Sequence, residues 1–253
     1  MVSSSKGEVM KRMMMGALAL ATLLGATAAQ AADMPRRSHT VAPVPFVNWT
    51  GFYVGAGGGY GFAKDDRQDF DAVFNMVSVN AQPKGGFINL KAGYNWRVDN
   101  FVFGPQAVFA LSNMKSTGNG SALAWGFIPT GATFTKSIDE FYQLQMRLGY
   151  LVTPNVLAYV KGGYMGGSGT VSGNVNIFSS PYTQFTAKNS FSGSTFGVGL
   201  EIAMRDNWAL QFDYDYMNGG TSNVSFQNPF GGTSTLAVNN KFQTVSGTLI
   251  KRF

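Results

Sequence analysis

Cysteine is absent from the 253 residues of the chain, and histidine occurs once, as His39. Without cysteine the chain has no disulfide framework and no thiolate metal site. Most hydrolase mechanisms also need a histidine base. His39 lies in a proline-rich stretch, where a solvated residue is expected. We therefore predict no enzymatic activity and no cofactor.

Charge and long apolar runs are scarce as well. Charged residues make up 13% of the chain, about half of the ~25% that is usual. After residue 31, sixteen basic and twelve acidic side chains leave a scattered net charge of +4, so no nucleic-acid partner is expected. No run of eighteen apolar residues follows the N-terminal region, which excludes membrane-spanning helices.

The N-terminal residues have the pattern of a secretory signal peptide over residues 1–31. Basic residues precede an apolar run at 13–24, and small residues then lead to an A-x-A cleavage site before Ala32. The alternative, a membrane anchor, would need a longer apolar run. The initiator is either Met1 or Met10.

The segment that follows, residues 32–48, contains three prolines and an Arg-Arg pair. This composition predicts an extended segment rather than part of a folded domain; if a membrane barrel follows it, this segment would be periplasmic.

Glycine, in contrast, is nearly twice as frequent as the usual ~7%. From residue 49 onward, segments of about ten to fourteen residues alternate apolar with small or polar residues, which is the period of a β-strand. A tilted strand of ~9–11 residues crosses a bilayer. The eight predicted strands are 49–62, 86–97, 100–112, 139–151, 156–169, 190–204, 207–217 and 241–253.

The connections between these strands alternate in length. Three are tight, at 98–100, 153–155 and 205–207, and four are long, at 63–85, 113–137, 171–188 and 219–239. Outer-membrane barrels have short periplasmic turns and long external loops. The sequence thus predicts an all-β fold over residues 49–253, an eight-stranded antiparallel transmembrane β-barrel with four long external loops.

The residues of each strand divide into two faces. Between residues 142 and 150 every second residue is apolar or aromatic, and Gln143, Gln145 and Arg147 lie between them. A soluble β-sandwich would turn the apolar face inward and carry a charged outer face, but here the polar faces are thin and rich in glycine. We therefore favour a membrane barrel over a soluble exported β protein. The residues predicted to form its aromatic girdle are Trp49, Tyr94, Trp96, Tyr150, Trp208, Tyr214 and Tyr216.

The interior of an eight-stranded barrel is only wide enough to be filled by side chains. Buried charges are tolerated when they are paired, so we expect an internal ion-pair network that plugs the barrel. The polar residues predicted to face this lumen are Lys91, Gln106, Gln143, Gln145, Arg147, Lys161, Glu201, Gln211, Asp213, Asp215 and Arg252.

The stretch GAGGG at 55–59 raises the alternative of a phosphate-binding loop. The dinucleotide pattern fails because Tyr60 stands where its third glycine belongs, and no Lys-Ser/Thr pair follows. On a strand, the odd-numbered glycines fall on the lumen face. We expect them to leave room for long charged side chains from other strands.

Several stretches resemble a known family as a set: NWTGFYVGAGGGYG, GYNW followed by NFVFGPQAVF, RLGYL, AYVKGGY, GVGLEIA, NWALQFDYDYM and the final KRF. They are similar to the small alphaproteobacterial outer-membrane β-barrels, called porin-family or outer-membrane immunogenic proteins, which are distant relatives of the OmpA barrel. The resemblance covers the whole mature chain. It implies a place in the cell outer membrane, delivery by periplasmic chaperones and insertion by the barrel-assembly machinery. That machinery reads a last strand ending in Phe, which Phe253 matches.

Two positions depart from the family pattern. The family usually has an acidic residue where Val108 stands, so one acid is missing from the expected network. It usually has an aromatic residue where Lys251 stands, and a lysine facing lipid must reach the interface with its amine.

The functional expectation is a structural and surface protein that contacts outer-membrane lipid and lipopolysaccharide and presents its loops, including to a host as an antigen. Cell-wall contact would come from residues 32–48. The alternative is a narrow porin-like channel for small hydrophilic solutes. The acidic stretch DDRQDFD at 65–71 could hold a divalent cation weakly, but a solvated loop is expected, so no metal site is predicted.

Overall fold

The structure is a computed structural model that describes residues 47–63, 67–72, 75–80, 82–124, 128–177, 180–227 and 233–253. The predicted signal peptide, most of the proline-rich segment and His39 lie outside these ranges. So do Asp65 and Asp66 of the acidic stretch.

The described ranges hold ten strands and one short 3-10 turn, η1 (Arg205–Asn207). The strands are β1 (Gly51–Phe62), β2 (Arg67–Ala72), β3 (Asn75–Asn80), β4 (Lys84–Val98), β5 (Phe101–Ala124), β6 (Ile128–Thr153), β7 (Val156–Ile177), β8 (Ser180–Ala203), β9 (Trp208–Gln227) and β10 (Thr233–Arg252).

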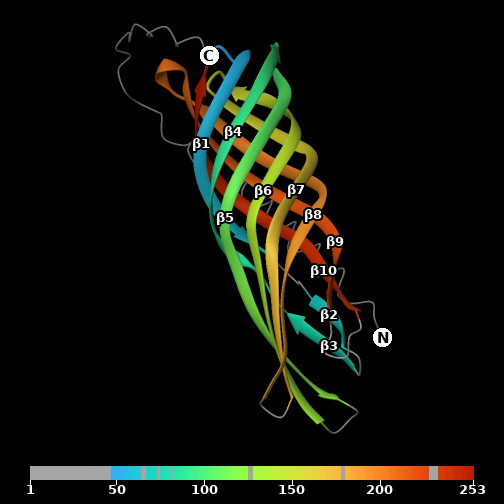
Figure 1. Ribbon diagram of the computed structural model, residues 1–253. Coiled ribbons are helices and arrows are strands. Elements are labelled where there is room, and N and C mark those ends of the chain that lie inside the picture. The colour runs from blue at the N-terminus through green and yellow to red at the C-terminus, as the bar shows by residue number, and fades with distance from the viewer. Residues whose placement is uncertain are drawn as a thin grey trace, which may run out of the picture. The chain divides into compact units, whose positions relative to one another are not determined.

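Eight of these strands close into a ring (Figure 1). Each strand from β4 to β10 pairs antiparallel with its neighbour in sequence, and β1 pairs with both β4 and β10. The closing register runs from Tyr53↔Arg252 to Phe62↔Gln243. The prediction of an eight-stranded antiparallel barrel is confirmed.

The tight turns lie where they were predicted. β4 and β5 are joined by Asp99 and Asn100, and Asp99 has a φ of 53°. In η1, Asp206 and Asn207 have φ values of 59° and 61°. Aspartate and asparagine tolerate this left-handed conformation better than other non-glycine residues, which is why these dipeptides can reverse the chain so sharply.

The four connections predicted as long loops contain more strand structure than expected. Most of 113–137, 171–188 and 219–239 continues the strands as hairpins, and 63–85 holds β2 and β3, of which β2 pairs with β10 at Leu236↔Phe70. These extensions lack apolar alternation, which was the sequence signal used to find strands. Rows of cross-strand hydroxyl contacts stabilise them instead, such as Thr117 with Thr135 at 3.1 Å and Ser172 with Thr186 at 3.2 Å.

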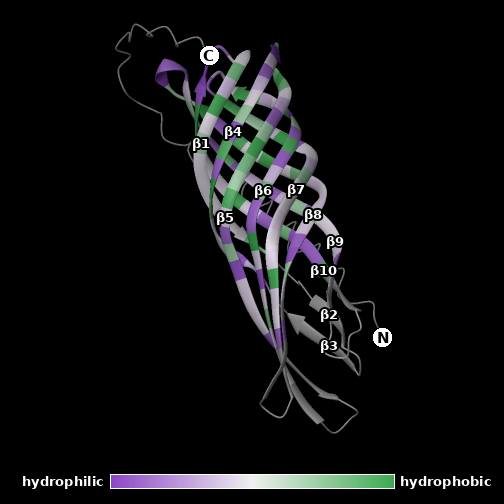
Figure 2. Cartoon of the chain, in the orientation of Figure 1, coloured by the Kyte–Doolittle hydropathy of each residue, from purple (hydrophilic) through white to green (hydrophobic). Residues whose placement is uncertain are grey.

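The apolar face of the ring points outward. Leu144 is 58% exposed, whereas the next residue, Gln145, is 3% exposed. Figure 2 shows the hydrophobic residues on the part of the ring that lies nearest the short turns. Polar-inside and apolar-outside is the reverse of a soluble sandwich, so the alternative of a soluble β protein is excluded. No helix among the described residues is long and apolar enough to span a membrane.

The aromatic girdle holds with one correction. Trp96, Tyr150 and Trp208 are exposed at the end with the short turns, but Trp49 is buried. Its indole Nε1 donates to the Pro154 carbonyl oxygen at 3.1 Å. Trp49 precedes β1 and therefore does not follow the inside–outside alternation of that strand.

Candidate functional site: the filled interior of the ring

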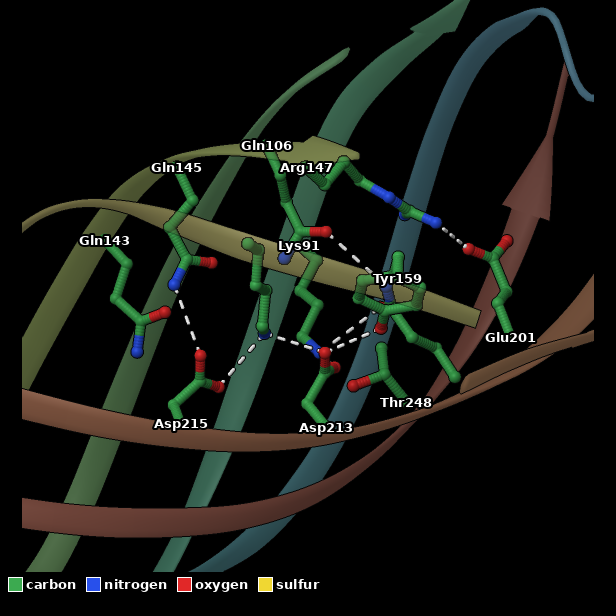
Figure 3. A network of polar contacts seen from close by, with 12 residues as sticks. Lys91, Gln106, Gln143, Gln145, Arg147, Tyr159, Glu201, Asp213, Asp215 and Thr248 are labelled. Carbon is green, nitrogen blue, oxygen red and sulfur yellow. Dashed lines mark hydrogen bonds and ion pairs between the residues drawn. The ribbon is translucent and has the colours of Figure 1, made fainter. Parts of the chain in front are cut away.

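All eleven polar residues predicted to face the lumen are buried. They come from seven strands of the ring, β4 to β10, and β1 contributes none of them. Their polar groups meet inside the barrel (Figure 3). Two charged clusters form, each centred on acidic residues.

The first cluster is built around the two aspartates of β9. Asp213 binds the amines of Lys91 on β4 and Lys161 on β7, the latter with an Nζ–Oδ1 distance of 2.7 Å. Lys161 also reaches Asp215 at 3.0 Å. Gln145 donates to Asp215 Oδ1 at 3.2 Å. Both carboxylates are thus paired with lysine amines from other strands of the ring, which is the arrangement that buried charges require.

The second cluster is built around Glu201 on β8. Arg147 Nη2 lies 2.5 Å from Oε2, and Arg252 Nη2 lies 2.6 Å from Oε1. The Arg147 guanidinium also stacks against Tyr159, at 4.3 Å from the ring centroid, and Arg252 stacks on Trp49 at 3.8 Å. Planar guanidinium groups can pair with a carboxylate and an aromatic ring at once, and here they do both.

Tyrosine and glutamine side chains join the two clusters. Tyr159 Oη donates to Asp213 at 2.6 Å, while its ring contacts Arg147 of the second cluster. Tyr53 donates to Gln106 at 3.0 Å, and Gln211 donates to the same Gln106 oxygen at 3.4 Å.

The sequence prediction missed Tyr53, Tyr159 and Trp49 as interior residues. For the two tyrosines a signal existed. Tyr159 alternates with the outward Val160 and shares the parity of Lys161, and Tyr53 alternates with two exposed neighbours. Strand parity therefore places both tyrosines inside the ring, although neither of them was assigned to a face from the sequence.

Apolar layers lie on both sides of the network. Towards the hairpin extensions a cluster of rings and thioethers fills the ring, including Phe87, Met114, Phe141, Met165 and Phe242. Towards the short turns a second cluster contains Trp49, Val102, Leu151, Leu157 and Tyr159. A cavity between Lys91, Val108 and Phe141 has a volume of about 10 Å³, which is about the room for one water molecule.

The charges of these two clusters do not balance. Four cations (Lys91, Arg147, Lys161 and Arg252) face three anions (Glu201, Asp213 and Asp215), which leaves one excess positive charge. Val108 is buried and lines the small cavity beside Lys91 and Asp215. The position where the resembling family has an acid therefore lies against the charged cluster.

The role predicted for the β1 glycines was wrong. A Cβ on Gly57 would lie 2.1 Å from the carbonyl oxygen of Gly247 on β10, and one on Gly59 would meet the Val245 carbonyl oxygen at 2.2 Å. These glycines allow the backbone of the closing strand to approach. Room for charged side chains is made on β8 instead, where a Cβ on Gly197 would meet Asp215 and Lys161.

Lys251 reaches the interface, as its exposure to lipid requires. Its Nζ donates to the Asp206 carbonyl oxygen in η1 at 2.7 Å and lies 5.0 Å from the centre of the Trp208 ring. The amine is thus held at the turn end of the barrel, where water is available.

The two neighbouring carboxylates of β9 are both engaged in ion pairs. Asp213 and Asp215 could resemble a pair of acid–base carboxylates, but lysine amines bind both of them. Among the described residues, no three side chains of His, Asp or Glu come together in a way that could hold a metal ion. The side chains of the acidic stretch 65–71 lie outside the described part of the chain.

Comparison with known proteins agrees with this architecture. The model of the outer membrane protein β-barrel domain family matches residues 17–242. The 31 kDa outer-membrane immunogenic proteins of Brucella melitensis biotype 1 and Brucella suis biovar 1 are each 34% identical over 219 residues, covering 82% of this chain and 88% of theirs. The crystal structure of OprG from Pseudomonas aeruginosa is similar over 81% of this chain and 97% of that one, with 11% identity and a TM-score of 0.49. The chain therefore belongs to the outer membrane protein β-barrel domain family and is an integral protein of the outer membrane.

Proposed function

We propose that this barrel is a closed, non-enzymatic structural protein of the outer membrane that acts through its outer wall and its external hairpins. The observation that carries the proposal is the filled interior. Apolar side chains cross the ring above and below the ion pairs, and the charged groups bind each other rather than lining a water-filled path.

A narrow channel for small hydrophilic solutes is the competing function. Porins conduct through wide barrels with a polar aqueous lumen. In this ring a solute would have to pass the layer of Phe87, Phe141 and Phe242, whose rings contact one another at centroid distances of 5.3 and 5.7 Å. Moving such a layer costs packing energy that a permanent pore does not need.

The surface part of the proposal is supported by the hairpin extensions and by the relatives. β5 to β8 continue well beyond the last lipid-facing residues as polar, hydroxyl-rich strands. The Brucella relatives carry the name outer-membrane immunogenic protein. For this chain we propose that the extensions form the antigenic surface and contact lipopolysaccharide. Insertion by the barrel-assembly machinery through Phe253 is a further part of the proposal.

Planar-bilayer conductance of the refolded full chain tests the closed barrel. We expect no stepwise current above that of protein-free bilayers, with a wide porin refolded in parallel as the positive control. Reproducible single-channel steps from the wild-type protein would contradict the closed barrel and favour the channel.

A further inference from the structure

The barrel wall opens between β8 and β9 on the side of the hairpin extensions. The antiparallel register of these two strands runs from Ala203↔Ala209 to Ser194↔Asn218 and ends there. Both strands continue, but beyond this point β8 pairs with β7 and β9 pairs with β10. On the side of the hairpin extensions the wall therefore has a seam between β8 and β9, and on the side of the short turns it has none there.

The sequence Asn218-Gly219-Gly220 accounts for the seam. Gly220 has a φ of 68°, in the left-handed region that favours glycine. On the partner strand β10 the register shifts between Asn239 and Lys241. A bulge bends the strand that contains it and increases its twist, so β9 and β10 turn away together from β8.

Side chains bridge part of the seam in place of the missing ladder. Ser222 Oγ on β9 donates to the Ser190 carbonyl oxygen on β8 at 3.1 Å. Asn240 on β10 donates to Ser222 Oγ at 2.8 Å and accepts from Asn189 on β8 at 2.9 Å. This bridge holds the two edges at a fixed separation, which makes the seam a formed feature of the wall.

A groove with a volume of about 690 Å³ lies along this seam, within the range of ~300–1,000 Å³ that is usual for small-molecule sites. Its described lining combines two exposed aromatic rings with hydroxyl groups and one carboxylate. The residues that matter for recognition are Phe109, Tyr142, Glu140, Ser190, Ser192 and Thr221.

The ring of Tyr142 packs over a glycine of the neighbouring strand β7, where there is no side chain in its way. A Cβ on Gly166 would lie 2.4 Å from Tyr142 Oη, so the ring packs over this glycine. Tyr142 is the last exposed aromatic on β6 before the polar Glu140. The groove thus begins where the lipid-facing band ends, at the level of the outer membrane surface.

The lining chemistry selects among ligand classes. No lysine or arginine belongs to the described lining, and Glu140 is negative, so phosphate and carboxylate ligands are disfavoured. A hydrocarbon would cover serine and threonine hydroxyls without pairing them, which costs free energy. A sugar supplies hydroxyls that both donate and accept hydrogen bonds, as the lining groups do, and an apolar ring face for an aromatic side chain.

We propose that this groove binds an uncharged saccharide. This proposal specifies the ligand class for the surface contacts of the proposed function, and it rests on the surface part of that function. It is independent of whether the lumen is closed, because the groove lies in the wall. Single-channel conductance would contradict the closed barrel and leave the saccharide proposal unaffected. A lack of sugar binding would contradict the saccharide proposal and leave the closed barrel unaffected.

Saturation-transfer NMR on the refolded full chain in dodecylphosphocholine micelles tests the site, with maltotriose, mannotriose and chitotriose as the probes. We expect transfer to at least one trisaccharide, reduced at least fivefold by Ser192→Trp, which fills the groove, and by Tyr142→Ala, which removes its ring. Tyr150→Ala is the matched control, because Tyr150 is similarly exposed on the same strand but lies near its short-turn end and does not line the groove, and it should leave the transfer unchanged.

The absence of transfer to all three sugars, or equal transfer to the wild type and both groove variants, would overturn the proposal. So would palmitate binding that Ser192→Trp abolishes while sugar transfer is missing, because the groove would then take acyl chains. Tyr142→Ala only shortens an exposed side chain and keeps the test decisive if Ser192→Trp does not fold.

Two sources of the sugar are then separated by affinity. The trisaccharide that binds is compared free and attached to diacylglycerol in nanodiscs. At least tenfold tighter binding of the attached form assigns the groove to a membrane glycolipid, and equal affinity assigns it to a soluble glycan.

Discussion

Glu201 is the residue on which the interior depends most directly. It is the only carboxylate that contacts Arg147 and Arg252 among the ion pairs of the described residues, and each of its oxygens binds one guanidinium. A buried ion pair adds little net stability compared with an apolar pair of the same shape, but removing one partner leaves an uncompensated charge in a low-dielectric site. Neutralising Glu201 would leave two such charges.

We therefore expect Glu201→Gln to lower the free energy of unfolding by about 3–5 kcal/mol. The substitution keeps the shape of the side chain, so the loss of unfolding free energy measures the effect of removing the charge. The measurement is urea unfolding in lipid vesicles followed by tryptophan fluorescence. Glu140→Gln is the control: Glu140 is exposed, and a change within about 0.5 kcal/mol is expected there. Equal effects at both positions would show that the Glu201 charge is not important for stability.

At this scale the sequence predicted much of the candidate site. Strand parity alone placed Gln143, Gln145 and Arg147 together, because a residue pointing inward is followed by one pointing outward along the whole strand. Strand parity could not predict which charged residues form ion pairs with each other. Lys91 and Asp213 are 122 positions apart, and which residues face each other across the ring depends on the register of every strand between them.

Among the strands, β1 is shaped by the closeness of β10. Most residues on the lumen side of β1 are glycines. A Cβ at Gly57 would also lie 2.6 Å from the Thr248 Cα. Because these are backbone atoms of a paired strand, they cannot move aside as the end of a flexible side chain could.

Gly57→Ala should therefore destabilise the barrel by about 1–3 kcal/mol, the usual cost of overpacking. Gly247→Ala on β10 is the matched control, since its Cβ would meet only the Phe212 ring, at 3.8 Å. The readout is the fraction of refolded protein that shows heat-modifiable migration on an SDS gel, together with the urea midpoint. A Gly57→Ala variant as stable as Gly247→Ala would contradict the close approach of the two backbones.

The strand ends show where sequence-based prediction fails at the element scale. Inside the membrane one face meets lipid and the other the lumen, so the sequence alternates and the strands were found. Beyond the membrane both faces of a hairpin can be polar, and a strand such as residues 113–124 of β5 has the composition of a loop. The seam between β8 and β9 was not predicted either, although the Asn218-Gly219-Gly220 stretch is a sequence signal for a bulge.

For the molecule as a whole, closure of the ring decides whether the other contacts can form. β1 pairs with β10 from the opposite end of the described barrel, and the Phe253 amide donates to the Phe52 carbonyl oxygen at 2.9 Å beyond the last register pair. Closure leaves the ring without a free edge at this point, which spanning strands require because lipid offers no hydrogen-bond partners.

Engineered cysteines test this closure and its register. Val54 lies opposite Lys251, and residues directly opposite in an antiparallel pair have Cα atoms about 4.5–5.5 Å apart, within the ~4.4–6.8 Å range of a disulfide. The chain has no cysteine of its own, so any disulfide formed within one molecule is the engineered one. We expect Val54→Cys/Lys251→Cys to oxidise readily in the folded barrel.

The product is recognised by boiling without reductant, after which the closed loop of the linked chain should migrate faster than the reduced chain. The control is Val54→Cys/Leu249→Cys. Leu249 pairs with Ala56, two residues along β1, and such diagonal neighbours are about 7–8 Å apart, too far for a disulfide of normal geometry. Preferential cross-linking of the control would place β10 two residues out of register. That shift keeps Arg252 facing inward but moves it along the barrel from Glu201, so the same experiment tests whether the ring closes in the one register that assembles the interior ion pairs.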